Sequence, residues 1–272
     1  MTKPLKINVI GGGPGGLYFS LLMKLAEPRH DITVYERNRA DDTFGFGVVF
    51  SDETLATFMG QDNETYRQIR DAFAYWDEIE VRYKGARVRS GGHGFAGMSR
   101  QKLLDILQGR CRDVGVKFHF ECDITDISQY RDADLVLGSD GVNSLVRETY
   151  KDSFKPTIDI RQTKFVWLGT TQKFDAFTFI FKPNEHGWFY NHAYQYGQGA
   201  GKAASTWILE THEDTWEKAG LDTANEEETL AYFEEMFVEE LDGHKLLSNK
   251  SIWRNFPVVS NKIWHHENVV LI

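Results

Sequence analysis

The chain has 272 residues, more than the ~100–200 that one domain usually holds, so we expect two lobes or one large α/β unit. With 41% hydrophobic and 26% charged residues and no apolar run near ~20 residues, its composition is that of a globular protein without a membrane span. The first residues lead directly into a strand pattern, which predicts no targeting peptide and a cytoplasmic location. The two cysteines lack C-x-x-C spacing and the nine histidines lack H-x-x-x-H spacing, so we expect no metal site.

The net charge of −9 is concentrated in one segment. Residues 210–242 contain thirteen acidic residues and one basic residue, Lys218, so the rest of the chain carries a net +3. The remaining chain can therefore accept a phosphate-bearing ligand, although no basic stripe indicates nucleic-acid binding. The acidic segment also has an apolar stripe at helical spacing, which predicts a helix with one solvated face: Leu230, Phe233, Phe237 and Leu241.

The first 36 residues predict a βαβ unit. Ile7 to Ile10 reads as a strand, a helix follows a glycine-rich turn from Gly15 to about Ala26, and Ile32 to Glu36 reads as a second strand. Such a unit requires a parallel sheet with a right-handed crossover. We therefore predict a Rossmann-like parallel sheet within residues 1–155. Further α/β elements continue this pattern: a helix from Ser99 to about Cys111, a strand from Val116 to Phe120 and a strand from Ala133 to Leu137.

Beyond residue 155 the pattern becomes alternating. Between Lys164 and Leu209, aromatic and β-branched residues alternate with polar ones, which is typical of antiparallel strands with one covered face. We predict an inserted antiparallel β-sheet substrate lobe over residues 156–258, with the acidic helix packed against it. Residues 259–272 are then expected to return as a strand to the first sheet. The predicted fold class is α/β.

The glycine-rich turn fits the dinucleotide-binding spacing G-x-G-x-x-G with Gly11, Gly13 and Gly16. The first glycine allows the tight turn, the second lets a pyrophosphate approach the backbone, and the third allows close helix–strand packing. Pro14 and Gly15 open the helix, whose N-terminus offers free N–H groups and a partial positive charge. A glycine-rich turn with a purely structural role is the alternative.

An acidic residue supports the dinucleotide interpretation. Glu36 lies 25 residues after Gly11, at the end of the second strand, where its carboxylate can accept the hydroxyl groups of an adenosine ribose. Arg37 follows directly and is a second candidate contact, in particular for the 2′-phosphate of NADP. Because Glu36 would repel that phosphate, the site itself favours FAD or NAD.

A second motif decides between these two cofactors. Residues 134–147, Asp-Leu-Val-Leu-Gly-Ser-Asp-Gly-Val-Asn-Ser-Leu-Val-Arg, resemble the Asp-Gly motif of class A flavoprotein monooxygenases, with Asp140 and Gly141 after a strand. In that family the motif lies near the FAD pyrophosphate, so the resemblance implies FAD, with NAD(P)H as co-substrate. A strand–turn–helix corner capped by Ser144 is the alternative, and Arg147 is expected to bridge the turn, with no catalytic role.

Two more segments resemble the same family. Arg100, at the start of a predicted helix, matches an arginine that contacts the FAD phosphates. An arginine there opposes the helix dipole, so a bound anion would make it favourable; a solvated arginine is the alternative. Gly45, Phe46 and Gly47 resemble a loop that passes the edge of the isoalloxazine ring, and a hairpin turn with core phenylalanines is the alternative.

The resemblance extends over almost the whole chain and is closest to the flavin domain of salicylyl-CoA 5-hydroxylases and 2-aminobenzoyl-CoA monooxygenases, with a violacein-pathway hydroxylase more distant. It implies that NAD(P)H reduces FAD, that O2 adds to give a flavin C4a-hydroperoxide, and that one oxygen atom is transferred to an aromatic ring. The family's Gly-Asp motif normally follows a strand like Asn268 to Ile272, where this sequence stops. We therefore expect the chain to be truncated before that motif.

The implied substrate is an aromatic acyl-CoA thioester, which needs a pocket. His192, Tyr190 and Tyr194 share one strand parity and are the candidate catalytic or pocket-lining residues; an ordinary half-buried sheet face is the alternative. Basic residues are available to bind a CoA tail, and a solvated surface role is the alternative for each: Arg161, Lys164, Lys182 and Lys202.

Two other functions stay open. The chain is alternatively a non-catalytic FAD-binding fragment, or a hydroxylase of a free indole-type aromatic. The lack of a Trp-x-Trp-x-Ile-Pro segment disfavours a flavin halogenase, and the lack of C-x-x-C disfavours a disulfide reductase. The sequence leaves open the choice between NADH and NADPH, the ring position that is hydroxylated, and the oligomeric state.

Overall fold

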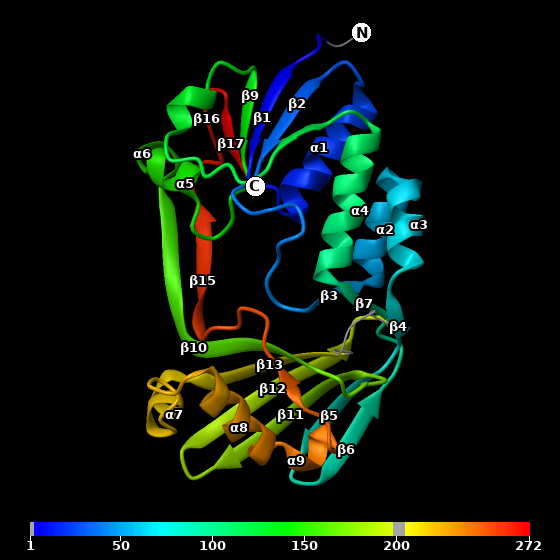
Figure 1. The fold of residues 1–272 in the computed structure, drawn as a ribbon, viewed down its shortest axis with the longest axis vertical. Helices are drawn as coiled ribbons and strands as arrows, with labels where there is room; N and C mark the ends of the chain where they lie inside the picture. Colours follow the sequence, from blue (N-terminus) through cyan, green and yellow to red (C-terminus); the bar gives the residue numbers. More distant parts are fainter. Residues whose placement is uncertain (1–2, 198–204) are drawn as a thin grey trace.

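The computed structural model describes residues 3–197 and 205–272. Two sheets lie one above the other along the long axis, with helices flanking the upper sheet and covering one side of the lower sheet (Figure 1). Parallel and antiparallel sheets thus occur in one chain, which confirms the expected α/β class. No helix in these residues is long and apolar enough to cross a membrane.

The upper sheet has six strands in the order β16-β17-β9-β1-β2-β8. The strands from β17 to β8 are parallel, and β16 is antiparallel to β17. The central strands are apolar runs buried on both faces, as expected for a parallel sheet. The strands are β1 (Lys6–Ile10), β2 (Asp31–Tyr35), β8 (Lys117–His119), β9 (Leu135–Gly138), β16 (His265–His266) and β17 (Val269–Leu271).

Helices cover both faces of this sheet (Figure 1). On one face α1 and α4 bury Leu17 and Leu107 in a cluster with Val9, and on the other α6 buries Phe154 in a cluster with Val136. A three-stranded sheet, β3-β7-β4, adjoins the first group. These elements are α1 (Pro14–Ala26), β3 (Gly47–Ser51), α2 (Asp52–Gln61), α3 (Asn63–Arg70), β4 (Ala74–Trp76), β7 (Phe95–Ser99), α4 (Arg100–Asp113), η1 (Ile127–Tyr130), α5 (Leu145–Thr149) and α6 (Lys151–Phe154).

The lower sheet has eight strands in the order β14-β10-β13-β12-β11-β5-β6, with β15 paired to β10. Its pairs are antiparallel except for β11 and β5, which are parallel. Strand β10 is long and runs from α6 down into this sheet (Figure 1). The strands are β5 (Ile79–Tyr83), β6 (Ala86–Ser90), β10 (Pro156–Thr170), β11 (Phe177–Asn184), β12 (Gly187–Gln195), β13 (Ser205–His212), β14 (Leu246–Leu247) and β15 (Arg254–Asn261).

One side of the lower sheet is covered by the acidic segment, as the apolar stripe predicted. Helices α7 (Glu213–Lys218), α8 (Glu226–Met236) and α9 (Val238–Leu241) pack on it. Phe233, Phe237 and Leu241 are buried in one cluster with Trp207 and Phe189 of the sheet. Glu226, Glu227, Glu228 and Glu235 of α8 are exposed, so the acidic helix is amphipathic and most of its charge lies on the solvated side. Glu234 is partly buried and pairs with Lys245.

Strands β5 and β6 come from the N-terminal half of the chain but belong to the lower sheet. The parallel pairing of β5 with β11 places Val81 opposite Phe179. The predicted boundary between residues 155 and 156 therefore does not coincide with the division between the two sheets. A pairing between such distant segments leaves no local pattern in the sequence, and the division into 1–155, 156–258 and 259–272 stays a prediction.

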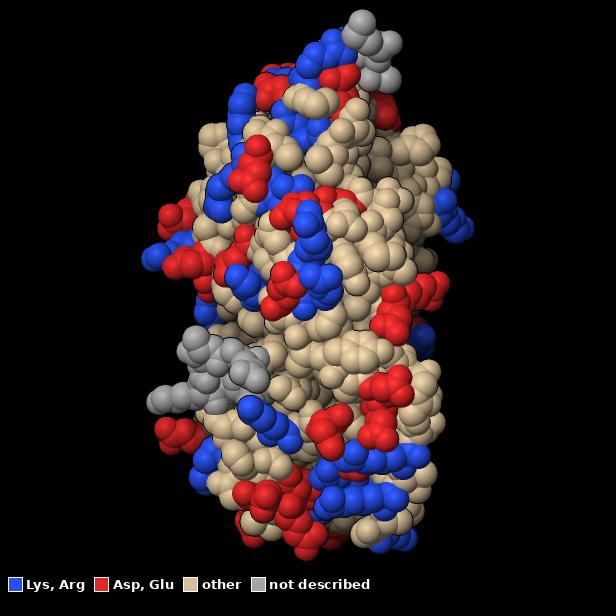
Figure 2. All heavy atoms as spheres, turned by 90° about the vertical axis from the view of Figure 1, so that its right-hand side faces the viewer, with Lys and Arg blue, Asp and Glu red and all other residues tan. Residues whose placement is uncertain are grey.

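The side of the molecule that carries α3 and β6 has charged side chains of both signs interspersed (Figure 2). Several of them form ion pairs, among them Arg67 with Glu64 and Arg89 with Asp175. Over the described residues on this side, no continuous basic band is visible.

The packing of α8 on the lower sheet gives a stability prediction. Phe233 is fully buried and its ring lies 5.6 Å from that of Phe189. Phe233→Ala should lower the free energy of unfolding by about 3–5 kcal/mol because it leaves a cavity. Val238, in the neighbouring α9, is 62% exposed, and Val238→Ala should change it by less than about 0.5 kcal/mol. Chemical denaturation followed by tryptophan fluorescence measures both, and equal losses would contradict this packing.

Candidate cofactor site

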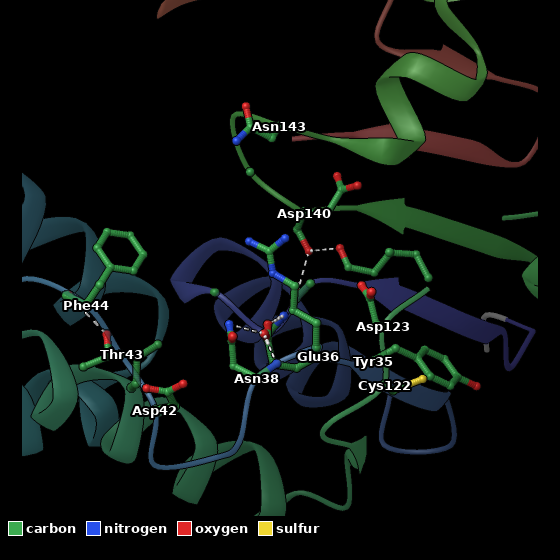
Figure 3. Close-up of a pocket in the computed structure, with 18 of the residues that line it drawn as sticks. Tyr35, Glu36, Asn38, Asp42, Thr43, Phe44, Cys122, Asp123, Asp140 and Asn143 are labelled. Atoms are coloured by element: carbon green, nitrogen blue, oxygen red, sulfur yellow. Dashed lines mark hydrogen bonds between the residues drawn. The ribbon is translucent and has the colours of Figure 1, made fainter. Parts of the chain in front are cut away.

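A cavity of about 490 Å³ lies at the carboxyl ends of β1, β2 and β9 (Figure 3). Ligands of parallel α/β sheets bind at this edge. The cavity brings together seven of the residues predicted from the sequence to hold a cofactor: Gly11, Gly13, Glu36, Arg37, Arg100, Asp140 and Gly141.

The glycines of the first turn differ in how closely other atoms surround them. Gly11 has φ +101, and a Cβ there would overlap the carbonyl oxygen of Ser139. A Cβ on Gly16 would overlap the carbonyl oxygen of Gly11. Gly13 instead has ordinary backbone angles, and nothing lies within 4 Å of the position its Cβ would take. Gly11 and Gly16 are thus required by packing, whereas Gly13 borders open space in the cavity.

The N-terminus of α1 opens on this cavity. Gly13 is its N-cap, no side chain caps it, and Pro14 occupies the first helical position. Among the described residues, no hydrogen bond occupies the N–H groups of Gly13, Gly15 and Gly16. Pro14, Gly15 and Gly16 do not themselves line the cavity. Free donors and the positive end of a helix dipole are the features that bind a phosphate.

Glu36 is fixed beside this turn. Its Oε2 accepts a hydrogen bond from Gly12 N (2.7 Å), and its Oε1 accepts from the backbone and side-chain nitrogens of Asn38 (both 2.8 Å). Because a carboxylate has about four acceptor positions, further donors such as ribose hydroxyl groups can still be accepted. Arg37 is exposed at the cavity rim, with no ion pair to any described residue.

The Asp140 carboxylate carries an orphaned buried oxygen. Its Oδ2 accepts from Val146 N (3.1 Å), whereas its Oδ1 is buried without a hydrogen-bond partner among the described residues. Arg147 donates to the carbonyl oxygens of Gly141 and Val142, and Ser144 Oγ caps Arg147 N at 2.9 Å. Asp140 lines the cavity and Arg147 does not, so Arg147 supports the turn that places Asp140 in the cavity wall.

Arg100 is a partly buried cation without a carboxylate partner. Its Nε donates to Thr43 Oγ1 (3.2 Å), and its guanidinium lies 4.6 Å from the centre of the Phe44 ring. Burial lowers the pKa of Arg100, and no described acidic residue forms an ion pair with it. An unpaired cation that lines a cavity is stabilised when an anion enters, so Arg100 and the α1 N-terminus together suit a pyrophosphate.

Gly45, Phe46 and Gly47 do not line this cavity. The Cβ of a residue at position 45 would lie 3.0 Å from the Trp167 ring, and one at 47 would overlap Tyr196. This loop therefore packs against the lower sheet, which its local sequence could not reveal. Its approach to a flavin ring stays a prediction.

Tyr190, His192 and Tyr194 also lie outside the cavity, on the side of β12 that faces away from α8. Tyr194 is buried; its hydroxyl donates to Gly47 O (2.9 Å), and burial raises its pKa to about 12. The Tyr190 ring packs edge-on against Phe181 at 5.5 Å. They share one face of the sheet, as their parity predicted, and their role stays a prediction.

The sequence interpretation missed several residues of the cavity wall. Cys122 to Ile124 follow edge strand β8, so the rule that ligands bind at the carboxyl edge of a parallel sheet could have found them. Lys250 and Arg254 come from the far end of the chain, and Lys250 pairs with Asp42. No local motif announces such long-range contributions.

The basic residues suggested for a CoA tail are engaged elsewhere. Ion pairs join Lys164 to Glu213 at 2.8 Å and Lys182 to Glu240 at 2.8 Å. Arg161 pairs with Asp159, its neighbour on β10. Lys202 lies outside the described residues.

The chain matches no family model. It is 41% identical to a salicyloyl-CoA 5-hydroxylase of Streptomyces sp over 98% of this chain and 53% of that protein. It is 30% identical to the protodeoxyviolaceinate monooxygenase of Chromobacterium violaceum over 98% and 72%, and 29% identical to a 3-hydroxy-4-methyl-anthranilyl-[aryl-carrier protein] 5-monooxygenase of Streptosporangium sibiricum over 98% and 71%. The chain thus spans about half the length of the first of these relatives.

Solved structures share this fold. The structure superimposes on 2-methyl-3-hydroxypyridine-5-carboxylic acid oxygenase with a TM-score of 0.77 at 17% identity, over 100% of this chain and 75% of that one. The chain therefore has the fold of that oxygenase. The chain belongs to the class A flavin-dependent aromatic monooxygenases.

The different surroundings of Gly11 and Gly13 give a stability prediction for the protein without cofactor. Gly11→Ala should lower the free energy of unfolding by about 2–4 kcal/mol, because the new Cβ meets backbone and the positive φ strains it. Gly13→Ala should change it by less than about 1 kcal/mol, since its Cβ enters open space. Urea denaturation without added cofactor measures both, and comparable losses would show that the turn is not packed as described.

Proposed function

We propose that the cavity binds FAD, with the adenosine ribose at Glu36 and the pyrophosphate at Gly13 and Arg100. The observation that carries this proposal is the convergence of two uncompensated positive features on one cavity: the open N-terminus of α1 and the unpaired Arg100. The orphaned Oδ1 of Asp140 at the same cavity supports it, because a buried acceptor needs a donor from a ligand or water.

The proposed activity is hydroxylation of an aromatic compound with O2 and NAD(P)H. Bound FAD would supply the redox and oxygen-transfer chemistry, so the protein has to supply binding, orientation and exclusion of water. The residues that hold the cofactor leave the lower sheet free to bind the aromatic substrate. Membership of the family supports this assignment.

For the substrate we propose an aromatic acyl thioester with an ortho hydroxyl or amino group. Two relatives are named for such compounds, one on CoA and one on an aryl-carrier protein. An electron-donating ortho group favours attack on an electrophilic oxygen. The pairing of Lys164 and Lys182 with acids means that a CoA tail would have to use other cations, such as Arg254 at the cavity rim.

Two alternatives each rest on one observation. A free indole-type aromatic is supported by the relative named for protodeoxyviolaceinate. A flavin-binding unit without activity of its own is supported by the coverage of only 53% of the salicyloyl-CoA relative.

The cofactor assignment predicts a selective effect of Arg100. Arg100→Gln should weaken FAD binding roughly ten- to hundredfold, since it removes a charge-assisted hydrogen bond of ~1.5–3 kcal/mol. Lys102→Gln removes the same charge two residues further along α4, at an exposed position outside the cavity, and should change the affinity less than about twofold. Titration followed by quenching of flavin fluorescence measures both, and equal effects would exclude Arg100 from the site.

The substrate assignment predicts which compounds accelerate NAD(P)H oxidation by the FAD-loaded chain. Salicyloyl-CoA or 2-aminobenzoyl-CoA should accelerate it at least tenfold and give a hydroxylated product, because the ortho group activates the ring. Stimulation and product formation by free indolic compounds alone would contradict the thioester assignment. Tight FAD binding without oxidation in any mixture would favour the non-catalytic alternative.

A further inference from the structure

The side of the lower sheet that faces away from α7 to α9 is aromatic and at least half-buried. Residues that alternate with the buried cluster under α7 to α9 point to the opposite side, because successive side chains of a strand alternate. We call this side the aromatic face. Over the central strands it carries Phe165, Trp167, Phe179, Phe181, Tyr190 and Tyr194.

One histidine–carboxylate pair lies among these rings. His192 Nε2 is 3.4 Å from Glu210 Oε1, and the two side chains are 29% and 21% exposed. The Phe179 ring lies 5.2 Å from the imidazole. Burial lowers the pKa of His192, and the charge of Glu210 opposes that shift. Other titratable or charged groups on the same face are Tyr190 and Tyr194 of β12, Tyr83 opposite Phe181 and Arg254 opposite Phe165. Burial favours the neutral form of the imidazole, which is the form that can accept a proton.

The nitrogen that remains available is Nδ1. Nε2 is the ring nitrogen next to Glu210, at an ion-pair distance, whereas Nδ1 is the nitrogen that has no carboxylate beside it. No described residue forms a hydrogen bond with Nδ1. A half-buried acceptor without a partner, in an aromatic setting, suits an aromatic ligand that brings its own O–H or N–H donor.

The aromatic face adjoins the cofactor cavity. The ring of Trp167 packs edge-on against Phe44 at 6.4 Å, and Phe44 lines the cavity. At the other end of the same loop, the Tyr194 hydroxyl donates a hydrogen bond to Gly47 O. A ligand on the aromatic face would therefore lie on the other side of the 43–47 loop from the cofactor cavity.

We propose that His192 accepts the proton of the substrate's ortho hydroxyl group on this face, with Glu210 as its positioning residue. The inference rests on the proposed function and names the group that selects an ortho-hydroxy substrate. The substrate O–H bond breaks, its electron pair stays on oxygen, and an N–H bond forms on Nδ1. The resulting imidazolium is stabilised by the Glu210 carboxylate, and the phenolate enriches the ring in electrons.

The test measures ionisation of a bound probe, without turnover. The FAD-loaded chain is mixed anaerobically, without NAD(P)H, with 2-hydroxy-5-nitrobenzoyl-CoA, whose phenolate is coloured, and the absorbance is followed against pH. The wild-type protein should lower the phenol pKa of the probe by at least one unit, a tenfold shift in the ionisation constant. His192→Gln should abolish the shift, and Glu210→Gln should reduce it.

His212→Gln is the matched control, since His212 also pairs with a carboxylate, Asp214, at 2.6 Å, but is exposed at the end of β13. It should leave the shift unchanged. The inference is overturned if the shift survives in both His192→Gln and Glu210→Gln. It is also overturned if the wild-type protein binds the probe without a shift, or does not bind it. If His192→Gln does not fold, as judged by circular dichroism, Glu210→Gln decides. Failure of the proposed function is distinguishable, because it appears as absence of FAD binding in the same samples.

Discussion

The backbones that follow β1 and β9 press against each other with no room for a side chain. Ser139 N donates to Ile10 O (2.8 Å), and its Oγ lies within 3.0 Å of the carbonyl oxygens of Ile10 and Gly11. Only glycine fits at positions 11 and 16 in this contact. As a result, the Gly13 turn, Glu36 and Asp140 all open on one cavity, and the free end of α1 points to the same space (Figure 3). The cofactor assignment depends on this contact.

A second contact connects the cavity at the upper sheet with the lower sheet. The 43–47 loop contributes Thr43 and Phe44 to the cavity wall, and its other end packs on the lower sheet through the bond from Tyr194 to Gly47 O. Arg100 N donates to Phe46 O (2.9 Å), so the cation of the cavity is anchored to the same loop. The cavity and the aromatic face therefore both contact one short segment, and a side chain at Gly45 or Gly47 would press on Trp167 or Tyr196.

Local chemistry explains what could be predicted. The spacing from Gly11 to Glu36 and the Asp140–Gly141 turn each reflect one βα or βαβ unit, so their placement at one edge follows from parallel pairing. The alternation around Tyr190 predicted a sheet with one covered face. The parallel pairing of β5 with β11, and the arrival of Lys250 at the cavity, depend on contacts between distant segments and carry no local pattern.

The His192–Glu210 pair shows the same difference between what a local pattern predicts and what depends on tertiary contacts. Strand parity grouped His192 with two tyrosines, but the carboxylate beside it, Glu210, comes from the neighbouring strand β13. Likewise, Gly45 and Gly47 were singled out by their spacing, while the reason for them, contact with Trp167 and Tyr196, is tertiary.

A crystal structure of the chain grown with FAD would test the central claim most directly. The account predicts the pyrophosphate within hydrogen-bond distance of Gly13 N and the Arg100 guanidinium, with an adenosine ribose hydroxyl group on Glu36. A pyrophosphate bound elsewhere, or a bound FAD that leaves the N-terminus of α1 without contact, would contradict it.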